Sequence, residues 1–113
     1  MNKNREIMIA RVWHGWTTLE NANVYENLLK TEIFPAIEKM NVIGYNKISL
    51  LKRTLGNEVE FITIMIFDNW NAVKEFAGEE YEKSYVPQKA RQVLLRHDDS
   101  SKHYEIINEL DYS

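Results

Sequence analysis

The sequence of 113 residues contains no cysteine, and it has only four glycines and two prolines. The absence of cysteine excludes disulfide bonds, thiolate metal ligands and a cysteine nucleophile. The few glycines form no GxGxxG or phosphate-loop pattern, which argues against a nucleotide cradle. No apolar run approaches the roughly 20 residues of a membrane-spanning helix. We therefore expect no membrane partner.

An excess of positive charge is also lacking. The formal net charge of -3 gives no basic footprint for nucleic acid. The basic first residues run into an apolar stretch that Arg11 interrupts early, with no small-residue cleavage site, so we expect a short tail and not a signal peptide. A cytoplasmic location is the resulting expectation. Length and a hydrophobic fraction of 44% predict one domain over residues 1–113, with a core at about 6–107.

The segment 58–77 has the clearest structural pattern. Residues 61–67 are apolar except for Thr63, and β-branched and aromatic side chains dominate among them. This composition predicts a strand that is buried on both faces. Asp68 and Asn69 then offer a side-chain N-cap to a helix that reaches about residue 78.

The other elements follow from periodicity and turn residues. A first strand is expected at 6–16, followed by a helix from Thr17 to Met40 whose N-cap is Thr17 and which kinks or breaks at Pro35. A second strand at 45–55 joins the third through a tight Gly56-Asn57 hairpin. The remaining predictions are helical turns at 80–85, a short helix after residue 87 and a last strand at 102–107.

The resulting order, β-α-β-β-α-β, predicts an α+β ferredoxin-like fold with a four-stranded antiparallel sheet. Right-handed crossovers place the first and third strands at its centre. Two helices cover only one face, so the other face would expose an apolar patch, and we expect a homodimer with the two sheets packed face to face. Ile7, Ile9 and Trp13 are expected on that dimer face, and Arg11 is expected to meet a carboxylate across the dimer.

Four segments carry a family resemblance: MIARVWHG at 8–15, FDNW at 67–70, EFAG at 75–78 and HYEI at 103–106. Through them the chain, over about residues 6–107, resembles the antibiotic biosynthesis monooxygenase-like family of the dimeric α+β barrel superfamily. The resemblance implies a dimeric barrel with a pocket in each subunit between the sheet and its helices. Characterised members oxidise aromatic polyketide-like substrates with molecular oxygen and without metal or flavin, so no cofactor is implied. Others degrade haem.

Three positions argue against haem degradation. The haem-degrading relatives carry an asparagine, a tryptophan and a haem-ligating histidine where this chain has Val12, Phe76 and Tyr85. Because tyrosinate can ligate haem iron in other proteins, haem binding through Tyr85 or His14 stays an alternative.

Cofactor-free oxygenation requires a base, donors for the resulting anion and apolar walls. The best candidate for the base is His14, on the side of the first strand that also carries Val12 and is expected to line the pocket. The alternative for His14 is a non-catalytic role near a strand end, where the side chain caps a backbone group or faces solvent. His103, at the start of the last strand, is a further polar pocket candidate. It could neighbour His14 in a relay or a two-histidine metal site, but structural contacts are the commoner role and no metal site is predicted.

The remaining pocket candidates are aromatic. Tyr81 and Tyr85 are expected one helical turn apart and could present two hydroxyls, or could equally form a core stripe. Trp70 is expected to form a wall of the pocket or of the dimer seam, and Phe76 is expected to line the pocket. The function predicted from these residues and the resemblance is cofactor-independent oxidation of a small aromatic or quinol-like compound by molecular oxygen. The alternative is a small-ligand-binding dimer without catalysis, or a haem-binding protein.

Overall fold

The computed structural model describes residues 7–113; Glu6, the expected start of the first strand, lies outside them. The chain forms strands and helices in this order: β1 (Ile9–Thr18), α1 (Leu19–Leu28), the π-helical turn η1 (Leu29–Ile33), α2 (Phe34–Lys39), β2 (Tyr45–Leu55), β3 (Glu58–Phe67), α3 (Trp70–Ala77), α4 (Gln88–Val93), β4 (Arg96–His97) and β5 (Lys102–Glu105).

The sheet has the strand order β2-β3-β1-β4, and β5 also pairs with β1, all antiparallel. The predicted ferredoxin-like fold, with the two most apolar strands at its centre, is confirmed. The last strand, expected as one piece, is instead two short strands on the same edge. Between them the Asp98 carboxylate accepts the backbone N–H of His14 at 3.0 Å. A side chain thus takes the place of a carbonyl in the ladder, which divides the edge strand.

Pro35 has the predicted effect on the first helix. The helix continues through residue 39, but it widens into the π-helical turn η1 immediately before Pro35, which lies in the first turn of α2. There the N–H of Phe34 bonds to the carbonyl of Leu29, five residues back. Proline lacks a backbone donor and crowds the preceding turn, so an irregular turn on its N-terminal side accommodates it.

Two local predictions are wrong. The N-cap of α1 is Thr18, whose Oγ1 accepts the N–H of Asn21 at 3.1 Å, and not Thr17, which is fully buried. Residues 80–85 are a turn and not a helix, because Ser84 N–H bonds to the Asp99 carbonyl and Ser101 N–H to the Glu82 carbonyl. Tertiary hydrogen bonds therefore take up the backbone groups that a helix would have used.

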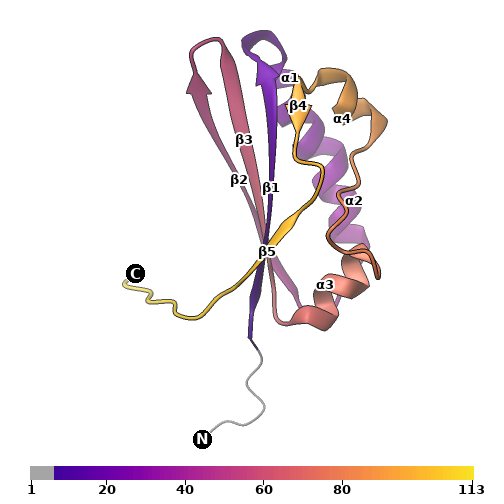
Figure 1. Cartoon of the computed structure of the whole chain (residues 1–113), viewed down its shortest axis with the longest axis vertical. Coiled ribbons are helices and arrows are strands. Elements are labelled where there is room, and N and C mark those ends of the chain that lie inside the picture. The colour runs from indigo at the N-terminus through magenta and orange to yellow at the C-terminus, as the bar shows by residue number, and fades with distance from the viewer. Residues whose placement is uncertain (1–6) are drawn as a thin grey trace, which may run out of the picture.

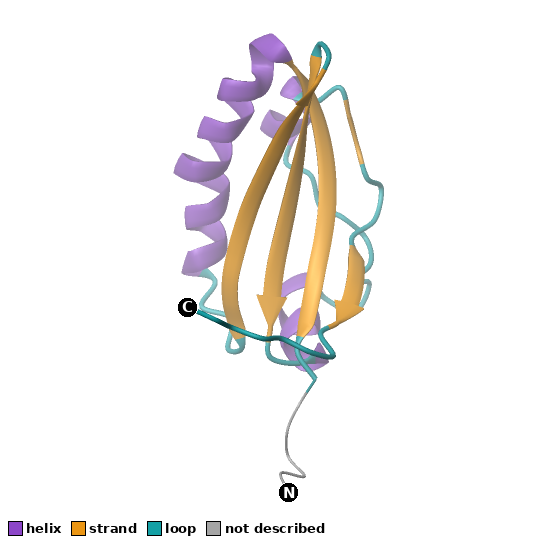
Figure 2. Ribbon diagram, turned by 90° about the vertical axis from the view of Figure 1, so that its left-hand side faces the viewer, coloured by secondary structure: helices purple, strands orange, loops and turns teal. Residues whose placement is uncertain are grey.

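All helices lie on one side of the sheet (Figures 1 and 2). Within residues 7–113, none of them is both long and apolar enough to cross a membrane. We call the helix-covered side of the sheet the inner face and the opposite side the outer face. On β1 the inner face carries Ile9, Arg11 and Trp13: Ile9 is fully buried against α3, and Trp13 packs against the buried cluster around Tyr25 and Phe61.

This orientation is the reverse of the predicted one. Val12 and His14 lie on the outer face, where their cross-strand neighbours are Ile64 and Ile62. The expectations that Ile9 and Trp13 form the dimer face, and that Arg11 reaches a carboxylate across a dimer, are wrong for the same reason. Helices cover the side of β1 on which these residues lie.

Candidate functional site

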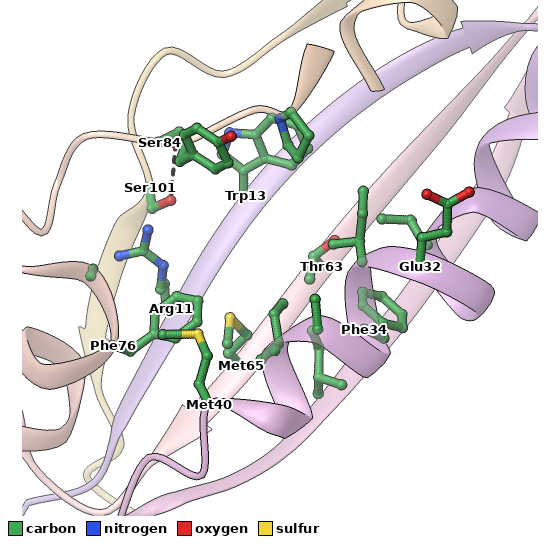
Figure 3. A pocket seen from close by; sticks show the side chains of 18 of the residues that line it. Arg11, Trp13, Glu32, Phe34, Met40, Thr63, Met65, Phe76, Ser84 and Ser101 are labelled. Atoms are coloured by element: carbon green, nitrogen blue, oxygen red, sulfur yellow. Dashed lines mark hydrogen bonds between the residues drawn. The ribbon is translucent and has the colours of Figure 1, made fainter. Parts of the chain in front are cut away.

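A cavity of about 680 Å³ lies between the inner face of the sheet and the helices (Figure 3). Its floor comes from β1 and β3, one wall from the first helix with its π-helical turn, and the other from α3 and the segment 83–87. Most of the lining is apolar or aromatic, including Trp13, Tyr25, Leu29, Ile33, Phe34, Ile37, Met40, Met65 and Phe76. A volume and lining of this kind suit a small, largely apolar molecule.

Arg11 is the buried charged group of this cavity. It is 8% exposed, and its Nη1 donates to the Tyr81 carbonyl at 2.6 Å and to Nε2 of His103 at 3.0 Å. The guanidinium carbon also lies 5.4 Å from the ring centroid of Phe76, which is cation–π distance. Burial lowers the pKa of Arg11 to about 10, so it stays cationic at neutral pH. The site therefore holds a positive charge within an apolar wall.

His103 accepts a hydrogen bond from Arg11 as a neutral imidazole. Burial, and secondarily the nearby Arg11 charge, lower the pKa of His103 to about 4. A neutral imidazole leaves Nε2 free to accept the hydrogen bond from Arg11. The rings of Trp70 and Tyr81 hold the imidazole, with centroids 5.6 and 5.3 Å from it.

The other polar groups of the cavity lie on its walls and rim. The hydroxyls of Ser84 and Ser101 are 3.0 Å apart on the wall near Arg11 (Figure 3). Glu32, on the opposite wall, accepts from the Lys89 ammonium at 2.9 Å. Lys83 lies at the rim. The polar lining is thus weighted toward hydrogen-bond donors and positive charge.

Five of the predicted pocket residues lie in or next to the cavity, in two groups. Phe76 and Tyr85 line the cavity, although Tyr85 is 87% exposed and stands at the rim. Trp70, Tyr81 and His103 form the cluster behind Arg11, where they also line a shallower depression. Arg11 contacts both groups, because its guanidinium lies over the Phe76 ring and donates a hydrogen bond to His103.

Val12 and His14 lie on the outer face, away from this cavity. Ring Nδ1 of His14 is 2.9 Å from Asp98 Oδ2, and Nε2 is 3.9 Å from Glu60 Oε2. The His14 ring also stacks on Trp16, with centroids 5.9 Å apart. The two suggested haem ligands, Tyr85 and His14, therefore occupy different faces of the sheet. Among residues 7–113, no group of three or more His, Asp or Glu side chains is arranged to hold a metal ion.

Sequence reasoning missed Arg11 as a site residue. One signal could have identified it: Arg11 alternates with Ile9 and Trp13, two large apolar residues on the same strand face. A charged residue on an otherwise apolar inner face is a candidate functional group. Ser84, Ser101 and the helix residues carried no comparable pattern.

Comparison with known proteins supports the fold. No protein-family model and no curated protein matches the chain. Among solved structures, a protein from Bacillus cereus, described provisionally as an antibiotic biosynthesis monooxygenase, is 13% identical, with a TM-score of 0.67 and coverage of 94% of this chain and 99% of that one.

Two further structures are similar. SnoaB, a cofactor-independent oxygenase from Streptomyces nogalater, is 12% identical, with a TM-score of 0.51 over 93% of this chain and 96% of that one. A protein from an uncultured marine organism, described as a dimeric ferredoxin-like protein, is 7% identical, with a TM-score of 0.53 over 99% and 97%. The chain has the ferredoxin-like fold of these proteins. At the level of the fold, this confirms the resemblance to antibiotic biosynthesis monooxygenase-like proteins. At such identities the chemistry must be argued from the cavity itself.

Proposed function

We propose that the protein is a cofactor-independent monooxygenase that oxidises a small phenol or quinol with molecular oxygen inside the cavity. The observation that carries the proposal is the buried Arg11 guanidinium in the wall of an otherwise largely apolar cavity of about 680 Å³. The fold shared with SnoaB, a cofactor-independent oxygenase, supports the same reaction class.

The reaction requires an electron-rich anion. In an anthrone, the keto tautomer of a phenol, the ring carbonyl activates the opposite methylene group, and loss of a proton gives a phenolate that transfers electrons to oxygen. One oxygen atom enters the ring as a carbonyl and the other leaves as water with the two methylene hydrogens, so CH₂ and O₂ become C=O and H₂O. A hydroquinone reacts as its phenolate: one oxygen atom replaces a ring hydrogen as a hydroxyl group, the other leaves as water, and the product is a hydroxyquinone. The protein contributes a donor that stabilises the anion and walls that exclude bulk water.

Arg11 is the residue we propose for anion stabilisation. The position of His14 on the outer face, hydrogen-bonded to Asp98, gives no support for its action as base in this cavity. A cation beside the substrate oxygen lowers the substrate's own pKa, so solvent hydroxide or a rim group suffices to remove the proton. Phe76, Met65 and Trp13 would hold the ring.

We further propose that the protein is a homodimer through the outer face. Ala10, Val12, Ile62, Ile64 and Ile66 form an apolar centre on the two middle strands of that face, as their cross-strand pairing shows. Ile66 is buried and the other four residues are half-buried, and the C-terminal segment crosses one end of this face (Figure 2). An apolar sheet face that no helix covers is typical of an interface. The similar marine protein is described as dimeric, which supports the proposal.

Oxygen uptake tests the proposed reaction. Anthrones and alkyl hydroquinones, presented to the purified protein at an oxygen electrode, should give substrate-dependent uptake without hydrogen peroxide release. Arg11→Met should lower kcat/KM by about 10²–10³, the usual effect of removing one anion-stabilising donor. Lys74→Met, which removes an equal charge from the exposed side of α3, is the matched control. Uptake by the variant at the wild-type rate would contradict the assignment to Arg11.

One observation favours a second function. His103 is the histidine nearest Arg11, and its Nε2 is already engaged by the guanidinium. A cavity with an anion-binding group but no free base beside it also suits a non-catalytic carrier of small aromatic molecules. Compounds that bind the cavity yet consume no oxygen across the whole panel would favour this function over the oxygenase.

A further inference from the structure

The positive charge of Arg11 has no carboxylate partner in the described part of the chain. Every ion pair among residues 7–113 forms between other residues. Its two polar contacts, the Tyr81 carbonyl and the neutral His103, carry no formal charge. A buried cation without a counter-ion is costly, and proteins retain such groups at functional sites.

Two nitrogens of the Arg11 guanidinium keep unused donors. Both of its hydrogen bonds within residues 7–113 leave from Nη1, so Nε–H and the Nη2 hydrogens have no protein acceptor there. Neither nitrogen is fully buried, because Thr17 Oγ1 is the one side-chain N or O atom in the same residues that is both fully buried and without a hydrogen-bond partner. Arg11 lines the cavity, so we infer that a ligand reaches these nitrogens through it.

The rest of the lining provides no competing negative charge at this point. Glu32 is the acidic residue of the cavity wall, and its carboxylate is paired with Lys89. The Ser84–Ser101 pair needs only one of its two hydroxyl hydrogens for their mutual bond, so the second hydrogen can be donated to a ligand. Lys83 also lines the cavity, and its ammonium is paired with Glu80 at 3.5 Å.

We propose that the cavity binds an aromatic acid, whose anionic oxygen group, a carboxylate or a phenolate, accepts hydrogen bonds from Nε and Nη2 of Arg11. The two donors of a guanidinium edge match two oxygen lone pairs in a planar fork. The ring of the ligand lies against Phe76 and Met65, toward the apolar end formed by the first helix. The inference deepens the proposed function by naming the charge of its substrate, and it depends on that function only for the choice of cavity.

Binding of matched probes tests the charge. 2-Naphthoate and 2-naphthamide share ring and shape but differ in charge. By isothermal titration calorimetry at neutral pH, the naphthoate should bind roughly tenfold or more tightly, as a charge-assisted bond to a buried guanidinium implies. Arg11→Met should abolish the difference, Arg11→Lys should retain part of it, and Lys74→Met should leave it unchanged. Circular dichroism checks that each variant is folded.

Three outcomes would overturn the proposal: equal binding of the two probes, a naphthoate preference that survives in Arg11→Met, or no binding of either probe. A second probe distinguishes the two anion sources. If a phenolate is the natural partner, the apparent pKa of bound 4-nitrophenol, read from its visible absorbance, falls in the wild type and not in Arg11→Met. If the bound nitrophenol titrates as it does in water while naphthoate is preferred, the partner is a carboxylate.

These results separate the inference from the oxygenase proposal. Selective naphthoate binding with no oxygen uptake for any phenol or quinol would leave the acid site standing and remove the oxygenase. Oxygen uptake together with equal binding of the acid and the amide would do the reverse.

Discussion

The two faces of the sheet carry the same kinds of residue in opposite settings. On the inner face, Arg11 and His103 meet at 3.0 Å, a cation beside a neutral imidazole within an aromatic cluster. On the outer face, His14 lies 2.9 Å from Asp98 and close to Glu60, in a polar group that keeps access to solvent. Among residues 7–113 the inner pair has no carboxylate within ion-pair distance, whereas the outer imidazole has two within 4 Å.

The comparison shows which polar groups are available for binding. Polar groups that already bond to one another, as His14 and Asp98 do, contribute to local structure and have little left to offer a ligand. A buried charge left without its counter-ion, as at Arg11, is the group a ligand can neutralise. Substitutions on the two faces and at the end of β1 are expected to reveal this difference in stability, assembly and pH dependence.

Phe61 and Ile62 are adjacent on β3 and point to opposite faces. Phe61 is 1% exposed and packs edge-on against Tyr25, with ring centroids 5.0 Å apart. Phe61→Ala should lower the free energy of unfolding by about 3–5 kcal/mol through lost burial and the cavity left behind. Urea denaturation measures the loss, which should not depend on protein concentration. A loss under about 1 kcal/mol would mean that the inner face is less tightly packed than described.

Ile64, at the centre of the outer face opposite Val12, tests the interface. A lysine there would bury a charge in the proposed dimer but be harmless in a monomer. Wild-type protein should sediment as a dimer and Ile64→Lys as a folded monomer. Lys74→Glu on the helix side should remain dimeric. If both variants sediment alike, the outer face is not the interface.

Thr17 and Thr18 extend the comparison to neighbouring side chains. Thr18 caps α1, so Thr18→Ala should destabilise the fold by about 1 kcal/mol. Thr17 Oγ1 is buried with no hydrogen-bond partner in the described residues. Thr17→Val should therefore leave the free energy of unfolding unchanged or raise it by up to about 1 kcal/mol. Thermal unfolding of both variants measures the contrast. Reversed signs would restore Thr17 as the cap.

His103 makes stability depend on pH. Its pKa is lowered to about 4 in the folded chain, below the ordinary value of 6.5, first by burial and then by Arg11. Between these values the unfolded chain binds more protons, so this contribution is present above pH 6.5 and is lost as pH falls toward 4. Unfolding midpoints from pH 7 to 4 should fall less steeply in His103→Gln than in the wild type. Parallel curves would place His103 in a more open setting.

The fold was predictable because its strongest signal is composition. Residues 61–67 are apolar enough to predict a central strand. Periodicity and turn residues give the order of the other elements, and right-handed crossovers place the first strand beside this one. The facing of β1 was not predictable in the same way. Both faces of β1 are largely apolar, and one carries Arg11 while the other carries His14. Which of these two side chains lies in the cavity depends on which face the helices cover.

The second half of the candidate site depended on long-range contacts. Tyr81 and Tyr85 were expected on a helix, but α3 ends at Ala77. The φ of 87° at Gly78 breaks the helical backbone, and hydrogen bonds to residues 99 and 101 hold the segment that follows. Hydrogen bonds between segments some seventeen residues apart leave no periodic trace in a sequence. Ser84 and Ser101, which meet through those bonds, could be identified only in the folded chain.

The π-helical turn at Leu29–Ile33 gives the cavity a simple route to change its specificity. A π turn is an α-helical turn with one residue inserted, so a natural deletion of the exposed Lys30 would restore an ordinary helix. Because the wide turn absorbs the extra residue, the segment after it would stay close to its present facing. Ile37 and Met40 would then remain on the wall, while the lining beside Leu29 and Ile33, where the wide turn lies, would change. We expect such a deletion to keep the helical circular dichroism signal while altering which aromatic probes bind. Relatives that differ by one residue here could therefore share a fold and an Arg11 site, yet accept substrates of different shape.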